Sequence, residues 1–349
     1  MKKRYKFGAL LLSAVLAMSL TACGGSASST PVSSSSPATS APAPSSDAAS
    51  TAEVDWPKKD ISVIVPFNPG GDTDFNARCY IEGVSKELGV NVNVVNVNGN
   101  GGAVGAMQAK QAANDGYTVL FSSSAFLTAQ LAETIDFTLD DMTFSCLVGQ
   151  GPGNCIMISK AFSDANGITD LATLKAYCDA NPGVLNCAAD TGATTQICAL
   201  MLKNKGFDLN VVDTGNSAER ITAMLGGNVD IIINSYGSIK SYIESGDFVC
   251  LGICTDQQPT HIPDVQTCVA QGFDIVFPSF FFFAFPSGTD EAIAEKWAAA
   301  CEKVAATQEY ADMVRDAYAQ DVVFDAGAAG KDKLSEAYQQ IASLKAEFQ

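Results

Sequence analysis

The chain of 349 residues contains one histidine and no obvious metal-binding cluster. His261 lies between two prolines in the segment QQPTHIPD, which is typical of a surface turn. A Ser-His-Asp hydrolase also needs a nucleophile on a tight elbow, and the nearest match, GNSAE at 215–219, lacks the closing glycine. No CxxC pair or Cys/His cluster occurs. The sequence therefore favours neither a catalytic site nor a metal site.

Basic residues are scarce as well. The 21 Lys and Arg residues face 38 Asp and Glu, which gives a formal net charge of −17. Such a balance argues against nucleic acid as a partner. Charges beyond a Debye length of ~8 Å are largely screened, so the net charge does not exclude a local site for an anion.

Nucleotide-binding motifs are also missing. The segment GNGGAVG at 99–105 follows an expected strand, but Val104 occupies the sixth position, where the dinucleotide fingerprint requires glycine. No glycine precedes Lys-Ser or Lys-Thr at the P-loop spacing. We therefore expect no cofactor.

The N-terminal segment resembles a lipoprotein signal. Basic residues precede an apolar run, 7–20, that is shorter than the ~20 residues that span a membrane as a helix. Cys23 follows Leu-Thr-Ala, which resembles a bacterial lipobox, so we expect a signal peptide at 1–22 and acylation of Cys23. Residues 23–55 are mostly Ser, Ala, Pro, Thr and Gly and predict a disordered tether.

Ten of the 11 cysteines follow Cys23. An even number in an exported protein permits disulfides. Most of these cysteines, however, lie in apolar stretches such as VCLGIC, where cysteine serves as a small hydrophobic residue. We expect mostly free, buried thiols.

The most informative stretch is 61–124, which contains two strand-glycine-helix units and a third strand. The apolar runs 61–65 and 90–97 each stop at glycines, and a helix-forming run follows. Such turns place bare backbone N–H groups at a helix N-terminus. Together with the helix dipole they form an anion site that needs no basic side chain.

Six segments of the chain are similar, in the same order, to those of the tripartite tricarboxylate transporter receptors, the Bug-type periplasmic solute-binding family. In the first lobe these are VPFNPGGDTD, NGNGGAVGA and DGYTVLFSSS. Downstream they are NPGVLNCAADTGATTQICA and TAMLGGNVDIIINS, followed by a return segment that contains SFFFFAFPSG. The resemblance covers about residues 56–349.

The resemblance implies a type II periplasmic-binding-protein fold, in which two α/β lobes with mixed, mostly parallel sheets enclose a ligand cleft and move about a hinge. Lobe 1 would comprise 56–154 and 278–349, and lobe 2 would comprise 155–277. The run Phe280 to Phe283 predicts a buried strand. Core positions at helix spacing are expected in the C-terminal segment at Trp297, Cys301, Val304, Val314, Ala317 and Tyr318.

The implied function is capture of a small organic carboxylate or amino acid outside the membrane, by a monomeric receptor that delivers it to the permease subunits of a tripartite tricarboxylate transporter. On this interpretation the protein is not an enzyme. The alternative hypothesis, from a different functional class, is a lipid-anchored surface hydrolase. A third hypothesis is a receptor that presents its ligand to a sensor.

Several residues in loops after strands are candidates for ligand binding, because such loops face the crevice of a two-lobed α/β protein. The first glycine loop offers backbone N–H groups, and later loops offer hydroxyl groups. The candidates are Phe67, Asn68, Gly71, Asp72, Thr73, Ser122, Ser123, Asp190, Thr191, Thr194 and Asn234.

The chain departs from the family pattern at acidic positions. Asp72 stands where a small residue is common, Asp190 enters the loop of the second lobe, and the segment 213–216 lacks a lysine that is often found there. Two acids near the cleft disfavour a tricarboxylate. A ligand with an amino group, or one that is neutral or a monocarboxylate, is favoured instead.

Overall fold

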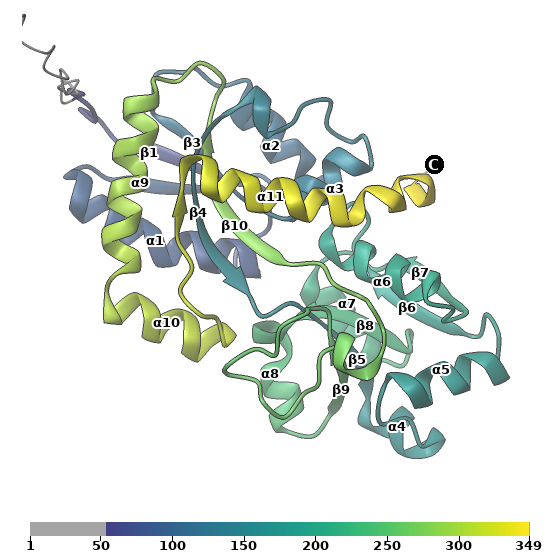
Figure 1. Cartoon of the computed structure of the whole chain (residues 1–349). Helices are drawn as coiled ribbons and strands as arrows, with labels where there is room; N and C mark the ends of the chain where they lie inside the picture. Colours follow the sequence, from purple (N-terminus) through teal and green to yellow (C-terminus); the bar gives the residue numbers. More distant parts are fainter. Residues whose placement is uncertain (1–53, 349) are drawn as a thin grey trace, which may run out of the picture. The chain divides into compact units, whose positions relative to one another are not determined.

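The computed structural model describes residues 54–348 (Figure 1). The expected signal peptide, the acylated Cys23 and most of the predicted tether lie outside the described residues. Residues 54–348 belong to one compact unit, which contains two β-sheets with helices on both faces of each. This arrangement has the predicted α/β class and the two expected lobes.

The sheet of lobe 1 has six strands in the order β11-β4-β10-β3-β1-β2. β1 pairs in parallel with β2 and β3, whereas β10 is antiparallel to β3 and β4. The strands are β1 (Ile61–Val65), β2 (Val92–Asn96), β3 (Thr118–Ser123), β4 (Thr143–Gly151), β10 (Ser279–Phe285) and β11 (Asp325–Ala326).

The sheet of lobe 2 has five strands in the order β7-β6-β8-β5-β9. β6 is parallel to β7 and β8, and β5 is antiparallel to β8 and β9. Both sheets are therefore mixed, and most strands of each run in one direction, as expected, whereas β10 and β11 in lobe 1 and β5 in lobe 2 run the opposite way. The strands are β5 (Asn154–Ser159), β6 (Leu185–Ala189), β7 (Leu209–Asp213), β8 (Ile231–Ser235) and β9 (Phe248–Ile253).

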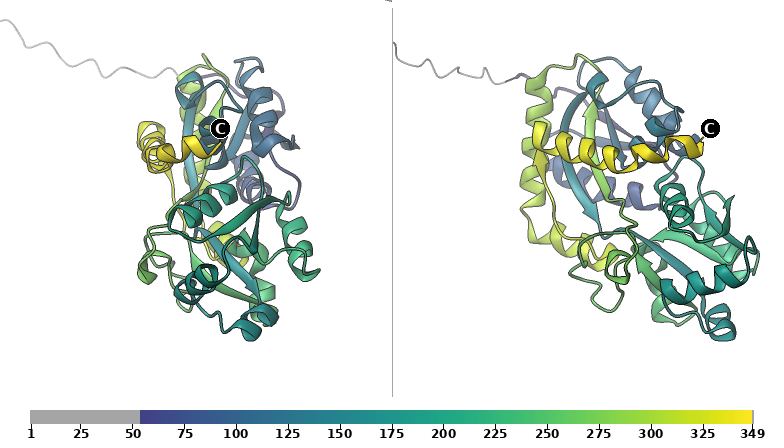
Figure 2. Two further views of the ribbon diagram at one scale, coloured as in Figure 1. Left: turned by 90° about the vertical axis from the view of Figure 1, so that its right-hand side faces the viewer. Right: turned by 45° about the vertical axis from the view of Figure 1, so that its right-hand side comes forward.

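Helices of lobe 1 cover both faces of its sheet, and α11 crosses beside β4 (Figure 2). On one face lie α1 (Asp72–Leu88), α9 (Glu291–Ala305) and α10 (Gln308–Tyr318), and on the other lie α2 (Ala103–Lys110), α3 (Ala125–Leu131) and α11 (Gly327–Ile341). Short 3₁₀ segments are η1 (Asn100–Gly102), η2 (Leu139–Asp141) and η4 (Ala342–Phe348).

Helices of lobe 2 likewise contribute to two different apolar clusters. Side chains of α5 (Leu171–Ala180) and α6 (Thr194–Asn204) join one cluster, and those of α7 (Ser217–Leu225) and α8 (Tyr236–Glu244) join another. The remaining helical segments are α4 (Lys160–Asn166) and η3 (Val269–Gln271).

The chain crosses from the first sheet to the second between Gly151 and Asn154 and returns between Ile253 and Ser279. The C-terminal helices then complete lobe 1, where β11 pairs with β4. We propose that the lobes meet near residues 155 and 277.

The phenylalanine run forms the buried strand β10, as predicted. Phe280 and Phe282 join the apolar cluster on one face of the sheet, while Phe281 and Phe283 join the cluster on the other. This alternation follows from the two-residue period of a strand. The run is continuous because both faces are covered by helices.

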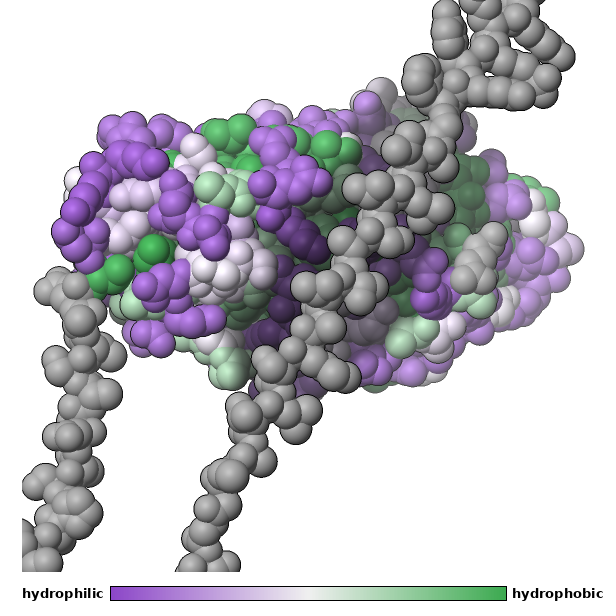
Figure 3. Space-filling view, turned by 90° about the horizontal axis from the view of Figure 1, so that it is seen from above, coloured by the Kyte–Doolittle hydropathy of each residue, from purple (hydrophilic) through white to green (hydrophobic). Residues whose placement is uncertain are grey.

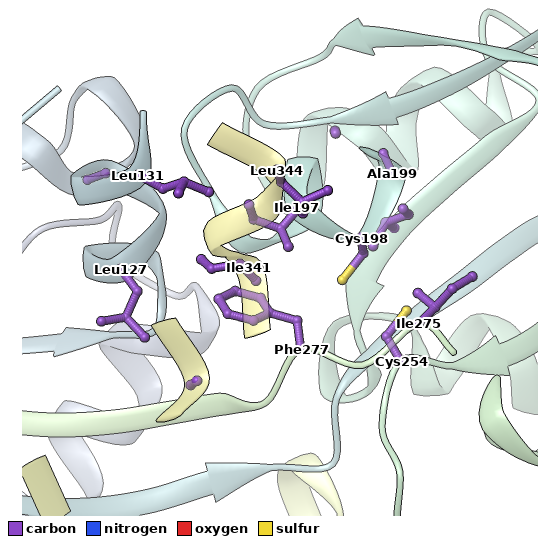
Figure 4. Packing of buried hydrophobic residues seen from close by; sticks show 14 of the residues in the cluster. Leu127, Leu131, Ile197, Cys198, Ala199, Cys254, Ile275, Phe277, Ile341 and Leu344 are labelled. Atoms are coloured by element: carbon purple, nitrogen blue, oxygen red, sulfur yellow. The ribbon is translucent and has the colours of Figure 1, made fainter. Parts of the chain in front are cut away.

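One apolar cluster extends through both lobes. It contains Leu127 of α3 and Ile341 of α11 in lobe 1, together with Ile197 of α6 in lobe 2. The C-terminal segment η4 contacts both α3 and α6, and Figure 4 shows Leu344 beside Ile197. The lobes therefore share a core as well as crossing strands.

All ten described cysteines are free thiols, and all but Cys250 are buried, as the sequence predicted. None of the helices within residues 54–348 is long and apolar enough to cross a membrane.

The surface mixes hydrophilic and hydrophobic residues on the face seen in Figure 3. Exposed large hydrophobic side chains come from different elements, which is ordinary for a protein surface. They are Val95, Val104, Val184, Leu225, Val269, Met313 and Val322.

Candidate functional site

A cavity of about 800 Å³ lies between the lobes. Lobe 1 lines it with the loops that follow β1, β2 and β3, and lobe 2 lines it with the loops that follow β6, β7 and β8. Loops at the carboxyl ends of parallel strands are the usual ligand sites of open α/β sheets. The volume lies within the range of ~300–1,000 Å³ typical of small-molecule sites.

Four helices begin at the cavity without a side-chain cap: α1 after Gly71, α3 after Ser124, α6 after Ala193 and α8 after Ser235. Within residues 54–348 no acceptor contacts the N–H groups of Asp72, Thr73 or Thr194. Free N–H groups at a helix N-terminus attract an anion through hydrogen bonding and the helix dipole. The neighbouring α7 differs, because Asn216 and Glu219 form its capping box.

Asp74 fixes the first glycine loop. Its carboxylate accepts hydrogen bonds from the Gly70 N–H group, from Arg78 Nε and from Asn96 Nδ2, each at 2.9 Å. Burial favours the neutral acid, but these bonds outweigh it and lower the pKa of Asp74. The Gly70 N–H group is thus occupied, and the loop is held in one conformation.

Asp72 is half-buried in the cavity wall. Asn76 Nδ2 donates to its Oδ1 atom at 3.1 Å. Burial raises the pKa of Asp72 to about 7, against the opposing effect of the Asn76 bond. A carboxyl group at this position is therefore close to half-protonated near neutral pH.

On the lobe 2 side, Asp190 and Thr194 line the cavity. Burial raises the pKa of Asp190 to about 6, and the positive charge of Arg220 acts in the opposite direction. Thr194 Oγ1 accepts a hydrogen bond of 3.2 Å from Asn154 Nδ2, and Thr195 Oγ1 accepts the Asp190 N–H group at 3.0 Å.

Arg220 is the functional candidate that the sequence analysis missed. It lines the cavity although only 5% of its surface is exposed. Its Nε donates to Asn234 Oδ1 at 2.6 Å, and its Nη1 donates to the Gly215 carbonyl oxygen. Burial lowers its pKa to about 10, with Asp190 opposing, so the guanidinium stays charged at neutral pH. The cavity wall thus offers a guanidinium in addition to the backbone N–H groups that the sequence suggested.

Eight of the eleven candidate residues line the cavity: Phe67, Asn68, Gly71, Asp72, Thr73, Ser123, Asp190 and Thr194. The other three do not. Ser122 is buried within β3, and Thr191 is exposed outside the cavity. Asn234 is completely buried, and it holds Arg220 and also donates to Ser217 Oγ at 2.7 Å.

Tyr318 belongs to the cavity wall rather than to the core, contrary to the prediction. It is the last residue of α10, and its ring lies 4.6 Å from the ring of Phe75, centroid to centroid. The helix ends there, and Ala319, which follows it, takes a left-handed φ of 54°.

Two glycine contacts join the lobes beside the cavity. A Cβ atom on Gly101 of lobe 1 would lie 2.6 Å from the Gly192 carbonyl group of lobe 2. A Cβ atom on Gly237 of lobe 2 would lie 2.1 Å from the Tyr318 ring of lobe 1. Both positions therefore need glycine for the lobes to approach this closely.

His261 does not line the cavity. It pairs instead with Asp321, with 3.1 Å between Nε2 and Oδ1. In the part of the chain that the structure describes, no group of three or more His, Cys, Asp or Glu side chains is arranged to hold a metal ion.

Comparison with known proteins gives consistent results. Residues 76–332 match the family model described as "Tripartite tricarboxylate transporter family receptor". The chain is similar to Protein BugT of Bordetella pertussis, with 31% identity over 245 residues that cover 68% of this chain and 74% of that protein.

Among solved structures, the fold is similar to that of the periplasmic binding protein BugD, with a TM-score of 0.75 and 22% identity over 84% of this chain and 98% of that one. It is also similar to MatC from Rhodopseudomonas palustris with bound malate, with a TM-score of 0.70 and 22% identity over 84% of this chain and 99% of that one. The fold is therefore that of the periplasmic binding proteins. From the family match and the relationship to BugT, this chain belongs to the receptor family of the tripartite tricarboxylate transporters.

Proposed function

We infer that the protein is an extracytoplasmic receptor, anchored through acylated Cys23, which captures a small organic carboxylate in the cavity between its lobes. The lobes close on the ligand by hinge motion, and the closed form delivers it to the membrane permease of a tripartite tricarboxylate transporter. The receptor works as a monomer, uses no cofactor and performs no chemistry on its ligand.

The observation that carries this proposal is the set of uncapped helix N-termini around the cavity. Free N–H groups line the cavity from both lobes, on α1 in lobe 1 and on α6 in lobe 2, so a ligand that spans the cavity meets donors on both sides. Each charge-assisted hydrogen bond contributes ~1.5–3 kcal/mol. Several such bonds offset much of the cost of removing an anion from water, and water molecules can bridge those groups that the ligand does not reach.

Relatives support the class of ligand. MatC is described with bound malate, a small carboxylate. The first glycine loop also fits a ligand-facing role, because Asp74 holds the loop while leaving the N–H groups of the first helical turn free.

The rival hydrolase hypothesis loses support. His261 pairs with Asp321 outside the cavity, so the one imidazole of the chain is not near the candidate hydroxyl groups. Without a base beside it, a serine or threonine hydroxyl remains a weak nucleophile.

Ligand-driven stabilisation without turnover tests the proposal. At 100 times its dissociation constant, a bound carboxylate adds ~2.7 kcal/mol to the free energy of unfolding. We expect such a rise in a thermal-shift screen of mono- and dicarboxylates and amino acids, with the ligand recovered unchanged. Recovery of a chemically altered ligand would overturn the receptor function.

A series at Gly71 locates the site. This residue has a φ of −79° and an added Cβ would lie 3.5 Å from the Asn68 carbonyl oxygen, so the backbone accepts a side chain here without strain. We expect Gly71→Ala to weaken binding slightly and Gly71→Val strongly, because the branched side chain blocks the N–H groups behind it. Circular dichroism verifies the fold and calorimetry measures affinity. Unchanged affinity in folded Gly71→Val protein places the ligand elsewhere.

A further inference from the structure

Charged side chains line the cavity from both lobes, and Arg220 is the one cation among those of the described residues that line it. Asp72 lines it from lobe 1 and Arg220 lines it from lobe 2. Glu219 also lies at the cavity, but its carboxylate accepts the Asn216 N–H group at 2.8 Å and belongs to the cap of α7. A ligand that spans the cavity therefore meets Asp72 on the lobe 1 side and, on the lobe 2 side, the Arg220 guanidinium with Asp190 and Glu219 near it.

Asp72 has no cationic partner within the protein. Among residues 54–348, no Lys, Arg or His side chain forms an ion pair with it, and its one side-chain donor is Asn76, at Oδ1. Its second carboxyl oxygen accepts no hydrogen bond from the described residues. A half-buried carboxylate of this kind lacks the cation that usually accompanies a buried charge.

Arg220 retains donors for a ligand. A guanidinium carries five N–H groups, and the protein uses one on Nε and one on Nη1. The other three contact no acceptor in the described part of the chain. The Asn234 contact holds the side chain in position, so the remaining N–H groups suit bidentate binding of a carboxylate.

We propose that the ligand is zwitterionic, an amino acid or a similar small molecule, whose ammonium group contacts Asp72 and whose carboxylate contacts Arg220. The inference rests on the proposed receptor function and names the chemical class of its ligand. A simple di- or tricarboxylate places a second negative charge near Asp72, whereas an ammonium group supplies the cation that Asp72 lacks.

The sign of the pH dependence distinguishes these ligands. Because the pKa of Asp72 is about 7, its ionised fraction rises from about one tenth at pH 6 to about nine tenths at pH 8. An ammonium ligand requires the ionised form, so its affinity rises up to about tenfold over this interval. A simple carboxylate binds better beside the protonated form, so its affinity falls.

Other titratable or charged groups face Asp72 from neighbouring elements. On α1 these are Asp74 and Arg78, which pair with each other, and on α10 the group is Tyr318, whose pKa burial raises. Across the cavity lie Arg220, Asp190 and Glu219. Asp190 also changes its charge near pH 6, because its pKa is about 6. The Asp72→Asn variant is therefore needed to assign the pH dependence to Asp72.

The experiment is titration calorimetry on the whole receptor with pairs of ligands that differ only in the amino group: aspartate and succinate, glutamate and glutarate, alanine and propionate. Each pair is measured at pH 6 and pH 8. We expect the amino member of at least one pair to bind tighter, with opposite pH trends for the two members. Asp72→Asn should abolish the rise for the amino ligand and improve binding of its partner.

A matched control replaces an exposed acid that does not line the cavity. Asp136→Asn removes a carboxylate and should leave every affinity unchanged.

Arg220→Lys keeps the positive charge but loses the two parallel N–H donors that bind a carboxylate, so all carboxylates should bind roughly 10- to 100-fold more weakly. Circular dichroism and the unfolding midpoint verify that each variant is folded.

The outcomes separate the two proposals. If no ligand in the panel binds or stabilises the protein, the receptor function fails. If simple carboxylates bind and their amino counterparts bind no tighter, or if both members share one pH trend, the zwitterion proposal is wrong while the receptor function stands. Equal losses for every ligand in Asp72→Asn also exclude a role for Asp72 in recognising an ammonium group.

Discussion

At the scale of single residues, Asp72 and Asp74 lie two positions apart at the start of α1, yet their pKa values shift in opposite directions. Burial favours the neutral form of both. Asp74 overcomes this effect with three donors, whereas Asp72 has one. The loop therefore contains one acid that maintains its structure and one that is free to respond to a ligand.

This difference predicts how stability without ligand depends on pH. The pKa of Asp72 rises from 3.8 to about 7 on folding, so the folded state loses stability as the pH increases between those values, and the loss is complete above pH 7. The full shift corresponds to ~4 kcal/mol, which solvent screening of the half-buried group reduces to about 1–3 kcal/mol. We expect Asp72→Asn to be more stable than wild type by that amount at pH 8 and equal at pH 3.5.

Urea unfolding at both pH values measures the effect. The exposed-acid variant Asp136→Asn is the control and should show no such gain. An Asp72→Asn protein that is less stable than wild type at pH 8 contradicts the assignment of Asp72 as a strained carboxylate.

Cavity residues that belong to loop motifs could be predicted from the sequence. Those whose place in the cavity depends on tertiary packing could not. Phe67 to Thr73 were predicted because glycines after a strand have local meaning. Arg220 was missed because it lies inside a helix beside the buried Ile221, where the pattern suggests core or cap. Ser122 and Ser123 look alike in the sequence, but only Ser123, at the end of β3, reaches the cavity.

At the scale of elements, the strand-glycine-helix units were predictable because each combines an apolar run with a turn. The pairings of the crossing strands were not, because antiparallel β5 and β10 carry the same apolar signal as parallel strands. The two-residue strand β11 has no periodicity to detect. Its pairing with β4 depends on the return of the C-terminal helices, which is a tertiary effect.

Helix α8 allows a test of lobe closure. Gly237→Ala suits a helix, where alanine is favoured over glycine by ~1 kcal/mol, but its methyl group would meet the Tyr318 ring. If ligand binding closes the lobes, the added methyl group should destabilise the closed form by ~1–3 kcal/mol through overpacking. Affinity should then fall roughly 10- to 100-fold while α8 stays intact.

Ser241→Ala, one turn further along the same helix and exposed, is the matched control and should bind normally. Calorimetry with whichever ligand stabilises the wild type provides the measurement. Wild-type affinity in Gly237→Ala would show that the Gly237–Tyr318 approach is not part of the ligand-bound form.

At the scale of the whole molecule, the division into lobes is clearer in the sheets than in the core. Two separate sheets flank the cavity, but one apolar cluster includes side chains from both lobes, with η4 between α3 and α6 (Figure 4). Unfolding lobe 2 alone would expose the faces of α3 and η4 to water at ~25 cal/mol for each Å² of apolar surface.

The shared cluster therefore makes the two lobes one cooperative unit in thermal denaturation, although chains of this size often unfold in steps. We expect residues 54–348 to unfold in a single calorimetric transition, with a calorimetric enthalpy equal to the van't Hoff enthalpy. Two resolved transitions would contradict this. A ligand that contacts only the cavity should then slow hydrogen exchange in the strands farthest from it, because those strands can exchange only when the whole unit opens.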